Sequence, residues 1–368
     1  MPLDALALTF DEIIAAVQPR PHELKPLRNA YRARLLGQPV PPPDTAYGKR
    51  NFEDVLSADI LPVVNRIDDG ELVKFVQRTH DGLDTESVVV PMQRTRGIWR
   101  TLCISSQVGC ARGCEFCETA QLGLVRSLTT SEIVGQVAAA QRDFDGTIRN
   151  IVFMGMGEPL DNYDHVLQAM RVFTDRHGLS FAQERITVST VGRTDGIRKL
   201  AALGWRRLNL AVSLNAPNDE IRSRIMPTNR AEPMAKLRDA LLAYPLRKCQ
   251  FFMIEYVLIP GVNDAREHAH EVAEYLRPLK SMLNLIPYNP RRESPWRAPT
   301  RDEVQQFLKW VEEAGQGVKL RITKGRDQMA ACGQLGNRAL ARRRAGVHLP
   351  LHPSAHHPDT QGHAEHEV

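Results

Sequence analysis

Three cysteines fall on one short segment of the chain, Cys110-Ala-Arg-Gly-Cys114-Glu-Phe-Cys117. Three thiolates on one tight loop can hold three corners of a cubane iron–sulfur cluster. A [4Fe–4S] centre normally takes four thiolates, so three leave one iron open to a small ligand. The amino and carboxylate groups of S-adenosylmethionine (SAM) suit that open position. An electron from the cluster could then cleave the sulfonium of SAM, so the loop predicts radical chemistry.

Structural zinc is the alternative for the same loop, with Cys103 or Cys332 as the fourth ligand. Zinc sites usually combine two pairs of closely spaced cysteines or histidines. The six cysteines of the chain include no second pair of this kind. The clustering in a chain without a secretory signal also argues against structural disulfides. The spacing therefore favours the iron–sulfur cluster.

Two further motifs carry groups that could act in such a site. The segment Gly155-Met-Gly-Glu158-Pro follows a predicted strand, where glycines let the backbone approach a ligand. Its carboxylate could accept a hydrogen bond from an ammonium group, although an ordinary turn would look the same. Cys332 lies among small residues, which would let its sulfur reach a substrate. A lone cysteine is more often a small apolar side chain.

Regular alternation of strands and helices begins near residue 100 and must position these groups. The predicted strands are Thr101–Ser106, Asn150–Met154, Arg185–Ser189, Leu208–Ser213, Phe252–Leu258 and Met282–Ile286. The predicted helices are Thr130–Phe144, Tyr163–His177, Asp195–Leu203, Met234–Leu242, Ala265–Leu276 and Arg301–Ala314. Six such units predict an α/β fold with parallel strands and chemistry at their carboxyl ends. Periodicity leaves a partial (βα)6 barrel and a doubly wound sheet both open.

The flanking regions differ in character. Residues 1–98 are expected to form an N-terminal accessory region, with helices over Phe10–Val17 and Leu24–Leu36 and then short strands and turns. Residues 99–335 form the predicted core. Residues 336–368 carry four arginines and six histidines without a core pattern, so we expect a disordered tail.

The composition limits the class of protein. No apolar run approaches the ~18–20 residues that cross a bilayer, and no signal peptide is recognisable, so a cytoplasmic protein without a membrane role is expected. A monomer is also expected. The formal net charge of +5 permits a polyanionic partner without demanding one.

The cysteine spacing, with Phe116 before the last cysteine, is typical of the radical SAM superfamily, whose usual fold is a partial (βα)6 barrel. From Thr101 to Leu335 the chain further resembles the radical SAM RNA adenine methyltransferases, the RlmN/Cfr family. The matching segments are Thr101-Leu-Cys-Ile-Ser-Ser-Gln-Val-Gly-Cys110, Met154-Gly-Met-Gly-Glu-Pro-Leu160, Ser213-Leu-Asn-Ala-Pro-Asn-Asp219, Asn284-Leu-Ile-Pro-Tyr-Asn-Pro290 and Ala331-Cys-Gly-Gln-Leu335.

The resemblance implies a role for each matching residue. The cluster ligands would be Cys110, Cys114 and Cys117. The SAM site would comprise Gly157, Glu158, Ser189, Ser213, Leu214, Asn215 and Asn289, with Gly157 and Glu158 at the methionyl amine. At position 215 the family usually carries histidine. The catalytic residues would be Cys332 as methyl carrier, Cys103 as the thiol that releases the product by forming a disulfide, and Glu86 as proton acceptor.

The implied reaction is methylation of an adenine ring carbon in ribosomal RNA, transfer RNA or both, with carbon 2 favoured over carbon 8. One SAM molecule would methylate Cys332, and a second would be cleaved to the radical that activates the S-methyl group. An electron donor such as flavodoxin or ferredoxin is then expected. Two alternatives remain: a radical SAM enzyme acting on a small molecule or protein, and a non-catalytic, metal-stabilised RNA-binding protein. The pair Cys103 and Cys332 favours the RNA methyltransferase.

Overall fold

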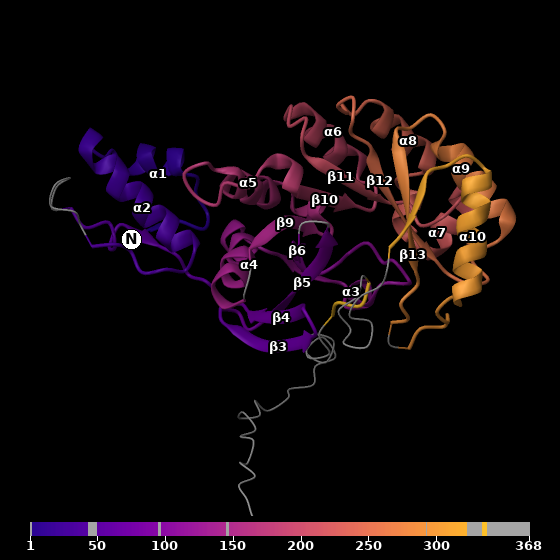
Figure 1. The fold of residues 1–368 in the computed structure, drawn as a ribbon, viewed down its shortest axis with the longest axis horizontal. Coiled ribbons are helices and arrows are strands. Elements are labelled where there is room, and N and C mark those ends of the chain that lie inside the picture. The colour runs from indigo at the N-terminus through magenta and orange to yellow at the C-terminus, as the bar shows by residue number, and fades with distance from the viewer. Residues whose placement is uncertain are drawn as a thin grey trace, which may run out of the picture. The chain divides into compact units, whose positions relative to one another are not determined.

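A mixed sheet of ten strands runs through the described part of the chain in the order β14-β13-β12-β11-β10-β9-β6-β5-β4-β3 (Figure 1). The computed structural model describes residues 2–42, 50–94, 97–144, 147–291, 293–321 and 333–336. The strands of this sheet are β3 (Val63–Asp69), β4 (Leu72–Arg78), β5 (Asp84–Arg94), β6 (Gly97–Cys103), β9 (Ile148–Phe153), β10 (Ile186–Thr190), β11 (Asn209–Ser213), β12 (Phe252–Leu258), β13 (Ser281–Pro287) and β14 (Val318–Leu320).

The order of the parallel strands decides between the two predicted α/β folds. From β6 to β14 every strand pairs in parallel with the next strand of this sheet along the chain. A doubly wound sheet reverses its strand order at a switch point, and no reversal occurs here. Figure 1 shows five helices around the outside of the curved sheet: α5 (Tyr163–Thr174), α6 (Thr194–Ala202), α8 (Met234–Leu242), α9 (Arg266–Leu276) and α10 (Arg301–Glu313). The predicted partial barrel is therefore confirmed, with β14 as an additional short strand.

The helices match the predicted positions closely because their ends carry strong local signals. They are α4 (Thr130–Asp143), α5 (Tyr163–Thr174), α6 (Thr194–Ala202), α7 (Asp219–Ile225), α8 (Met234–Leu242), α9 (Arg266–Leu276) and α10 (Arg301–Glu313). Helix α4 begins after Thr129 and α10 after Thr300, and each threonine forms a capping box with a glutamate three residues later. Helix α7 was not predicted.

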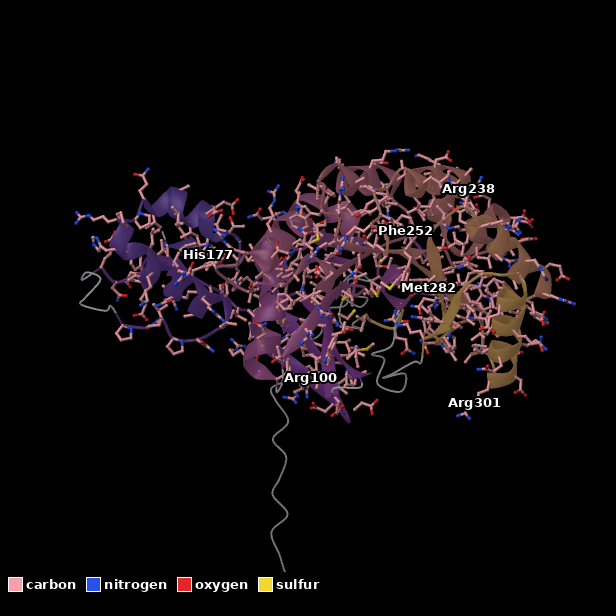
Figure 2. The ribbon with its side chains drawn as sticks, turned by 45° about the horizontal axis from the view of Figure 1, so that its top comes forward. Arg100, His177, Arg238, Phe252, Met282 and Arg301 are labelled. Carbon is pink, nitrogen blue, oxygen red and sulfur yellow. The ribbon has the colours of Figure 1, made fainter. Side chains whose placement is uncertain are left out.

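The core lies between the sheet and these helices. Strands β10 and β11 are buried along nearly their whole length, as expected of parallel strands covered on both faces. Phe252, at the start of β12, is buried, whereas Arg301, at the start of α10, is exposed (Figure 2). None of the helices among the described residues is long and apolar enough to span a membrane.

The N-terminal segment packs against the end of α5. It contains β1 (Leu3–Asp4), α1 (Phe10–Val17), α2 (Leu24–Leu35) and β2 (Leu56–Ser57), and both helices agree with the prediction. The Phe10 amide donates to the Asp175 carboxylate at 2.5 Å, and the Phe10 and His177 rings lie 4.9 Å apart. The Tyr31 hydroxyl donates to the Leu8 carbonyl at 3.0 Å. Up to Gly336 the described residues belong to one compact unit.

Strands β3, β4 and β5 extend the barrel sheet on its antiparallel side. They pair with one another, and β5 pairs antiparallel with β6, the first barrel strand. The turns at Gly70 and Gly82 have φ values of 59° and 75°, which glycine adopts without strain. The expected boundary at residue 98 falls inside β6, and it remains a prediction. The expected tail lies outside the described residues apart from Gly336.

A small separate hairpin and short helical segments complete the fold. Strand β7 (Gln107–Gly109) pairs antiparallel with β8 (Leu124–Ser127), and α3 (Glu118–Gln121) lies between them in the chain. Short 3₁₀ turns occur at Pro21–Glu23, Pro159–Asn162, Gln183–Arg185 and Pro227–Arg230.

Candidate active site

The three clustered cysteines sit on a loop that the β7–β8 hairpin holds in place. Gly109 has a φ of 77°, and a Cβ atom there would collide with the carbonyl oxygen of Gly123. Only glycine therefore fits directly before Cys110, because the two arms of the hairpin approach so closely. The Cys110 amide donates to the same Gly123 carbonyl at 3.0 Å, which fixes the start of the loop.

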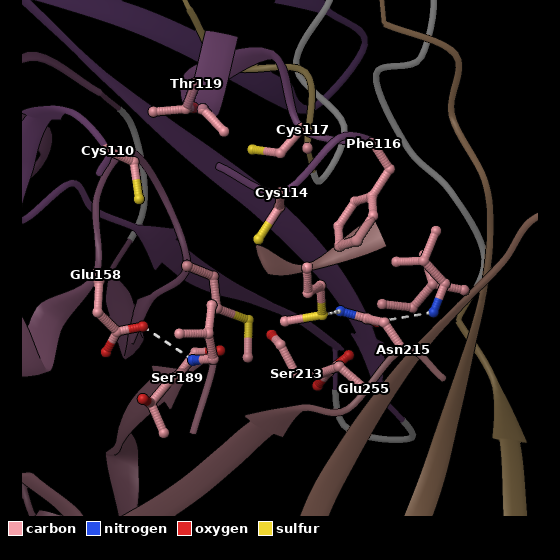
Figure 3. Close-up of a pocket in the computed structure, with 18 of the residues that line it drawn as sticks. Cys110, Cys114, Phe116, Cys117, Thr119, Glu158, Ser189, Ser213, Asn215 and Glu255 are labelled. Carbon is pink, nitrogen blue, oxygen red and sulfur yellow. Dashed lines mark hydrogen bonds between the residues drawn. The ribbon is translucent and has the colours of Figure 1, made fainter. Parts of the chain in front are cut away.

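The loop faces a pocket at the carboxyl ends of the barrel strands (Figure 3). The pocket contains about 970 Å³ of space free of atoms, including its open side. Most of the predicted site residues line it: Cys110, Cys114, Cys117, Gly157, Glu158, Ser189, Ser213, Asn215 and Asn289. Barrel topology explains this convergence, because parallel strands end at one edge.

The remaining predicted residues lie elsewhere. Leu214 is buried outside the lining, and its backbone carbonyl accepts from Arg222 at 3.1 Å. Glu86 and Cys103 are buried and are also absent from the lining. Cys332 lies outside the described residues, but its neighbour Gly333 lines the pocket.

The environment of the three cysteines disfavours thiolates unless a cation is present. Burial raises the pKa of the Cys110 thiol to about 12. Burial is also the main cause of the raised pKa values of Cys114 and Cys117. A bound metal reverses this preference, since a coordinated thiol loses its proton. Three thiols on one pocket wall suit a positively charged iron–sulfur core.

The described side chains do not form a site for a single metal ion. Among the described residues, no group of three or more histidine, cysteine, aspartate or glutamate side chains is placed to hold one ion. A cubane presents its irons at separate corners, so its thiolate ligands need not converge on one point.

Glu158 is held rigidly at the opposite side of the pocket. Its carboxylate accepts from the Leu160 amide at 3.0 Å and from the Val191 amide at 2.9 Å. Burial raises its pKa to about 7. Gly157 has a φ of 100°, and a Cβ atom there would lie 2.5 Å from the Gln107 Cβ, so glycine is required. The segment thus presents a buried carboxylate to a ligand at fixed geometry.

Asn215 braces the loop after β11. Its backbone has a φ of 59°, a left-handed conformation that asparagine tolerates well. Its side chain accepts from the Val257 amide at 3.0 Å and donates to the Met226 sulfur at 3.4 Å. The Asn263 side chain donates to the Asn215 carbonyl at 2.8 Å. Asparagine at this position therefore shapes the pocket wall.

Arg222 is a structural residue of the site that the sequence analysis missed. It is fully buried, and its guanidinium donates to the Val191 carbonyl at 2.5 Å, the Leu214 carbonyl at 3.1 Å and the Asn229 side chain at 2.7 Å. Burial lowers its pKa from the usual value, but an arginine remains charged in proteins. It ties together the loops that follow β10 and β11.

Glu255 was also missed, although its position inside an apolar strand was a usable signal. It lines the pocket, and its Oε2 accepts from Asn284 at 2.7 Å and lies 3.6 Å from Arg321. Its Oε1 is buried and has no hydrogen-bond partner among the described residues. Ser213, Glu255 and Asn284 are register neighbours on β11, β12 and β13, so they form one polar row across the barrel.

Glu86 and Cys103 share one face of the sheet. The Lys74 ammonium lies 2.8 Å from the Glu86 carboxylate, and both side chains are buried. Val88 pairs with Cys103 across β5 and β6. Directly opposed residues of an antiparallel pair project to the same face, as do residues two apart on one strand. Glu86 and Cys103 therefore lie on the same side of the sheet. The α4 side is the opposite one, because Ser87 of β5 donates to Gln136 of α4 at 2.7 Å.

Comparison with known proteins gives a consistent assignment. Residues 104–276 match the family model described as "Radical SAM superfamily". The chain is 44% identical over 302 residues to "Probable dual-specificity RNA methyltransferase RlmN 1" of Protochlamydia amoebophila, covering 82% of this chain and 83% of that protein. It is 45% identical over 274 residues to "Dual-specificity RNA methyltransferase RlmN" of Geobacter sulfurreducens, covering 74% of each.

A solved structure agrees with these relatives. The crystal structure of a radical SAM methyltransferase from Sphaerobacter thermophilus superposes with a TM-score of 0.78 at 35% sequence identity. The match covers 90% of this chain and 99% of that one, so it extends beyond the barrel. The chain thus shares most of its length with these relatives and its fold with this structure, and it belongs to the RlmN family of radical SAM methyltransferases.

Proposed function

We propose that this protein methylates a ring carbon of an adenine in RNA, carbon 2 in preference to carbon 8, through a methyl-cysteine intermediate. One observation carries the proposal: the three cysteines, the Gly157–Glu158 segment and Gly333, the neighbour of Cys332, line the same pocket. The names of the curated relatives, dual-specificity RNA methyltransferases, support RNA as the substrate. Ribosomal and transfer RNA are both candidates.

The cofactors proposed are one [4Fe–4S] cluster, held by Cys110, Cys114 and Cys117, and SAM. When bound, they supply the methyl group and the one-electron chemistry that an electron-poor ring carbon requires. Glu158 accepts a hydrogen bond from the amino group of SAM, and the Leu160 and Val191 amides keep its carboxylate in place. An external electron donor, such as flavodoxin or ferredoxin, completes the set of partners.

The walls of the pocket orient the ligand and limit water. The hydroxyl groups of Ser189 and Ser213 and the side chain of Asn289 offer hydrogen bonds along the lining. Phe116 and Tyr288 belong to a buried apolar cluster that also contributes to the lining. An apolar surface beside polar groups suits the adenosyl part of SAM, which has a flat ring and a polar sugar.

The chain's own thiols and its buried carboxylate perform the transfer. Cys332 carries the methyl group to the ring. Glu86 accepts the ring proton as aromaticity returns, and the Lys74 ammonium lies 2.8 Å from that carboxylate. The Cys103 thiolate then attacks the Cys332 sulfur. A disulfide forms as the bond between that sulfur and the ring-bound carbon breaks, and this carbon keeps the electron pair and takes a proton to become the methyl group of the released RNA. This step requires the two Cα atoms to come within about 7 Å.

The experiment is mass spectrometry of nucleosides from RNA treated with reconstituted protein, SAM and a reductant. The proposal predicts 2-methyladenosine in folded RNA, lost with Cys332→Ala. Production of 8-methyladenosine instead would show that carbon 8 is methylated and would contradict the preference for carbon 2. Unmodified RNA, in the presence of measured SAM cleavage, would contradict the proposed substrate.

A further inference from the structure

The four residues after Cys332, Gly333–Gly336, are bonded to separate parts of the molecule, and we refer to them as the clamp. The Glu118 amide donates to the Gly333 carbonyl at 2.7 Å. The Thr119 hydroxyl donates to the Leu335 carbonyl at 2.5 Å. Both donors belong to α3, which follows Cys117 directly, and Figure 3 shows Thr119 beside Cys117.

The clamp reaches two other functional segments. The Gln334 side chain donates to the Pro290 carbonyl at 3.1 Å, next to Asn289 in the pocket lining. The Gly336 amide donates to the Glu86 carboxylate at 3.1 Å. One short stretch is therefore bonded to the cysteine loop, to the loop after β13 and to the proposed proton acceptor.

Burial and backbone geometry show that the clamp is a packed element. Gln334 and Leu335 are only 2% and 4% exposed. Gly333 has a φ of 82°, which favours glycine, and it lines the pocket. A Cβ atom on Gly336 would lie 3.0 Å from the Glu118 side chain, so the contact is close. A buried amide donor such as that of Gln334 is costly to leave unpaired, so its bond resists opening.

We propose that the clamp holds the carrier Cys332 at the cysteine loop and thereby couples SAM cleavage to methyl transfer, with Gln334 as the main positioning residue. The inference rests on the proposed function. Adjacent Cα atoms are ~3.8 Å apart, so an anchored Gly333 limits how far Cys332 can move from the pocket.

Coupling fixes the ratio of 5′-deoxyadenosine to methylated adenine. In a coupled turnover, one hydrogen moves from the carrier's S-methyl group to the adenosyl group, which leaves as 5′-deoxyadenosine, so one such molecule accompanies each methylated adenine. If the carrier is displaced, the adenosyl group takes its hydrogen from the added reductant or buffer. The result is 5′-deoxyadenosine without methylated RNA.

The first test needs no cofactor. Cluster-free protein is treated with N-ethylmaleimide, and modification of Cys332 is followed by peptide mass spectrometry, with the exposed Cys249 as internal reference. Gln334→Met keeps the side chain's size and removes the donor. It should raise the Cys332 rate about three- to tenfold, the effect of losing one hydrogen bond. Gln306→Met, on the exposed face of α10, is the matched control and should change nothing.

The second test measures coupling in reconstituted enzyme. Gln334→Met should raise the ratio of 5′-deoxyadenosine to methylated adenine about three- to tenfold while iron content stays at the wild-type level. Gly336→Pro, which lacks the amide hydrogen, should act similarly, and Gly336→Ala controls for the added Cβ atom. If Gln334→Met does not fold, the two variants Gly336→Pro and Gly336→Ala still test the inference.

The outcomes separate the clamp from the function on which it rests. Wild-type protein that never methylates Cys332 would refute the proposed function. Wild-type activity with unchanged ratios and unchanged Cys332 reactivity in Gln334→Met and Gly336→Pro would refute the clamp alone. An equal increase in Gln306→Met would also refute it.

Discussion

The Lys74 ammonium and the Glu86 carboxylate form a buried ion pair, 2.8 Å apart, on the side of the sheet that also carries Cys103. Both groups come from the antiparallel strands that precede the barrel. The proposed proton acceptor is thus supplied by the extension of the sheet rather than by the barrel itself. The Lys74 ammonium on the neighbouring strand β4 balances the charge of Glu86, and the Gly336 amide of the clamp donates to the same carboxylate.

The first prediction concerns this pair. Lys74→Met should destabilise the fold by about 3–5 kcal/mol, because it leaves a buried carboxylate unpaired. The double variant Lys74→Met/Glu86→Gln should recover most of that loss. Denaturant unfolding of the two single variants and the double variant gives the coupling energy. A loss below about 1 kcal/mol in Lys74→Met would show that the pair is effectively exposed.

The second prediction is a pH dependence of SAM binding. Burial raises the pKa of Glu158 to about 7, and only the ionised carboxylate can pair with an ammonium group. Affinity should therefore rise as pH increases through 7 and fall up to about tenfold per unit below it. Glu158→Gln should bind weakly at every pH. Anaerobic calorimetry measures the effect, and a flat profile for the wild type would exclude this role.

The Glu158 carboxyl also makes the stability of the ligand-free protein depend on pH. Stability falls as pH rises, whereas SAM affinity increases. The pKa of this carboxyl in the folded protein lies above the ordinary glutamate value of 4.5, so the folded state binds the proton more tightly. Its contribution to the free energy of unfolding is present below pH 4.5 and is lost as pH rises to about 7. Ligand-free wild-type protein should lose this stability over that range, whereas Glu158→Gln should not.

Arg222 provides the third prediction. Its guanidinium donates to the carbonyls of Val191, which lines the pocket, and Leu214, which lies next to Ser213 of the lining. Arg222→Met keeps the volume but leaves these buried acceptors unpaired, at a cost of at least about 2 kcal/mol. Both the unfolding midpoint and SAM affinity should fall. Unchanged SAM affinity in a folded variant would show that the loops hold their shape without it.

Local signals account for most of the fold that was predicted. Capping residues such as Thr129 and Thr300 mark helix starts, and α1 spans the predicted residues Phe10–Val17. No local sequence signal indicates which strands pair with each other, so the antiparallel pairing of β5 with β6 could not be predicted. The three-residue strand β14 could not be predicted from sequence patterns either.

The residues of the candidate site also include some that sequence patterns indicate and some that they do not. The spacing of the three clustered cysteines, Cys110, Cys114 and Cys117, indicates a cluster-binding loop. Glu255 could have been predicted because a carboxylate inside an apolar strand is unusual. Arg222 could not, because arginine is normally a surface residue. Its burial depends on carbonyls from two loops that come together only in the folded chain.

The cluster supplies the fourth prediction. Anaerobically purified protein should contain about four irons per chain, as a [4Fe–4S] centre requires. Replacing Cys110, Cys114 or Cys117 with alanine should remove both the iron and SAM cleavage, whereas Cys249→Ala, at an exposed position, should retain them. Iron and labile-sulfide analysis decides the matter, and stoichiometric zinc without sulfide would overturn the assignment.

The proposed carrier and its partner thiol should behave differently when each is removed. Cys332→Ala should keep the cluster and lose methyl transfer, because no cluster ligand is touched. Wild-type protein from cells should contain a methylated Cys332 peptide. Active enzyme with an unmethylated Cys332 would contradict the carrier role.

The covalent state of Cys103→Ala during turnover tests the central claim most directly. Incubated with RNA, SAM and reductant, this variant should methylate Cys332 and attack the adenine, and then stall. Denaturing gels and intact-mass analysis should detect a protein–RNA adduct joined through Cys332, since no thiol remains to expel the product. Normal turnover by Cys103→Ala, with free methylated RNA and no adduct, would contradict the methyl-cysteine mechanism.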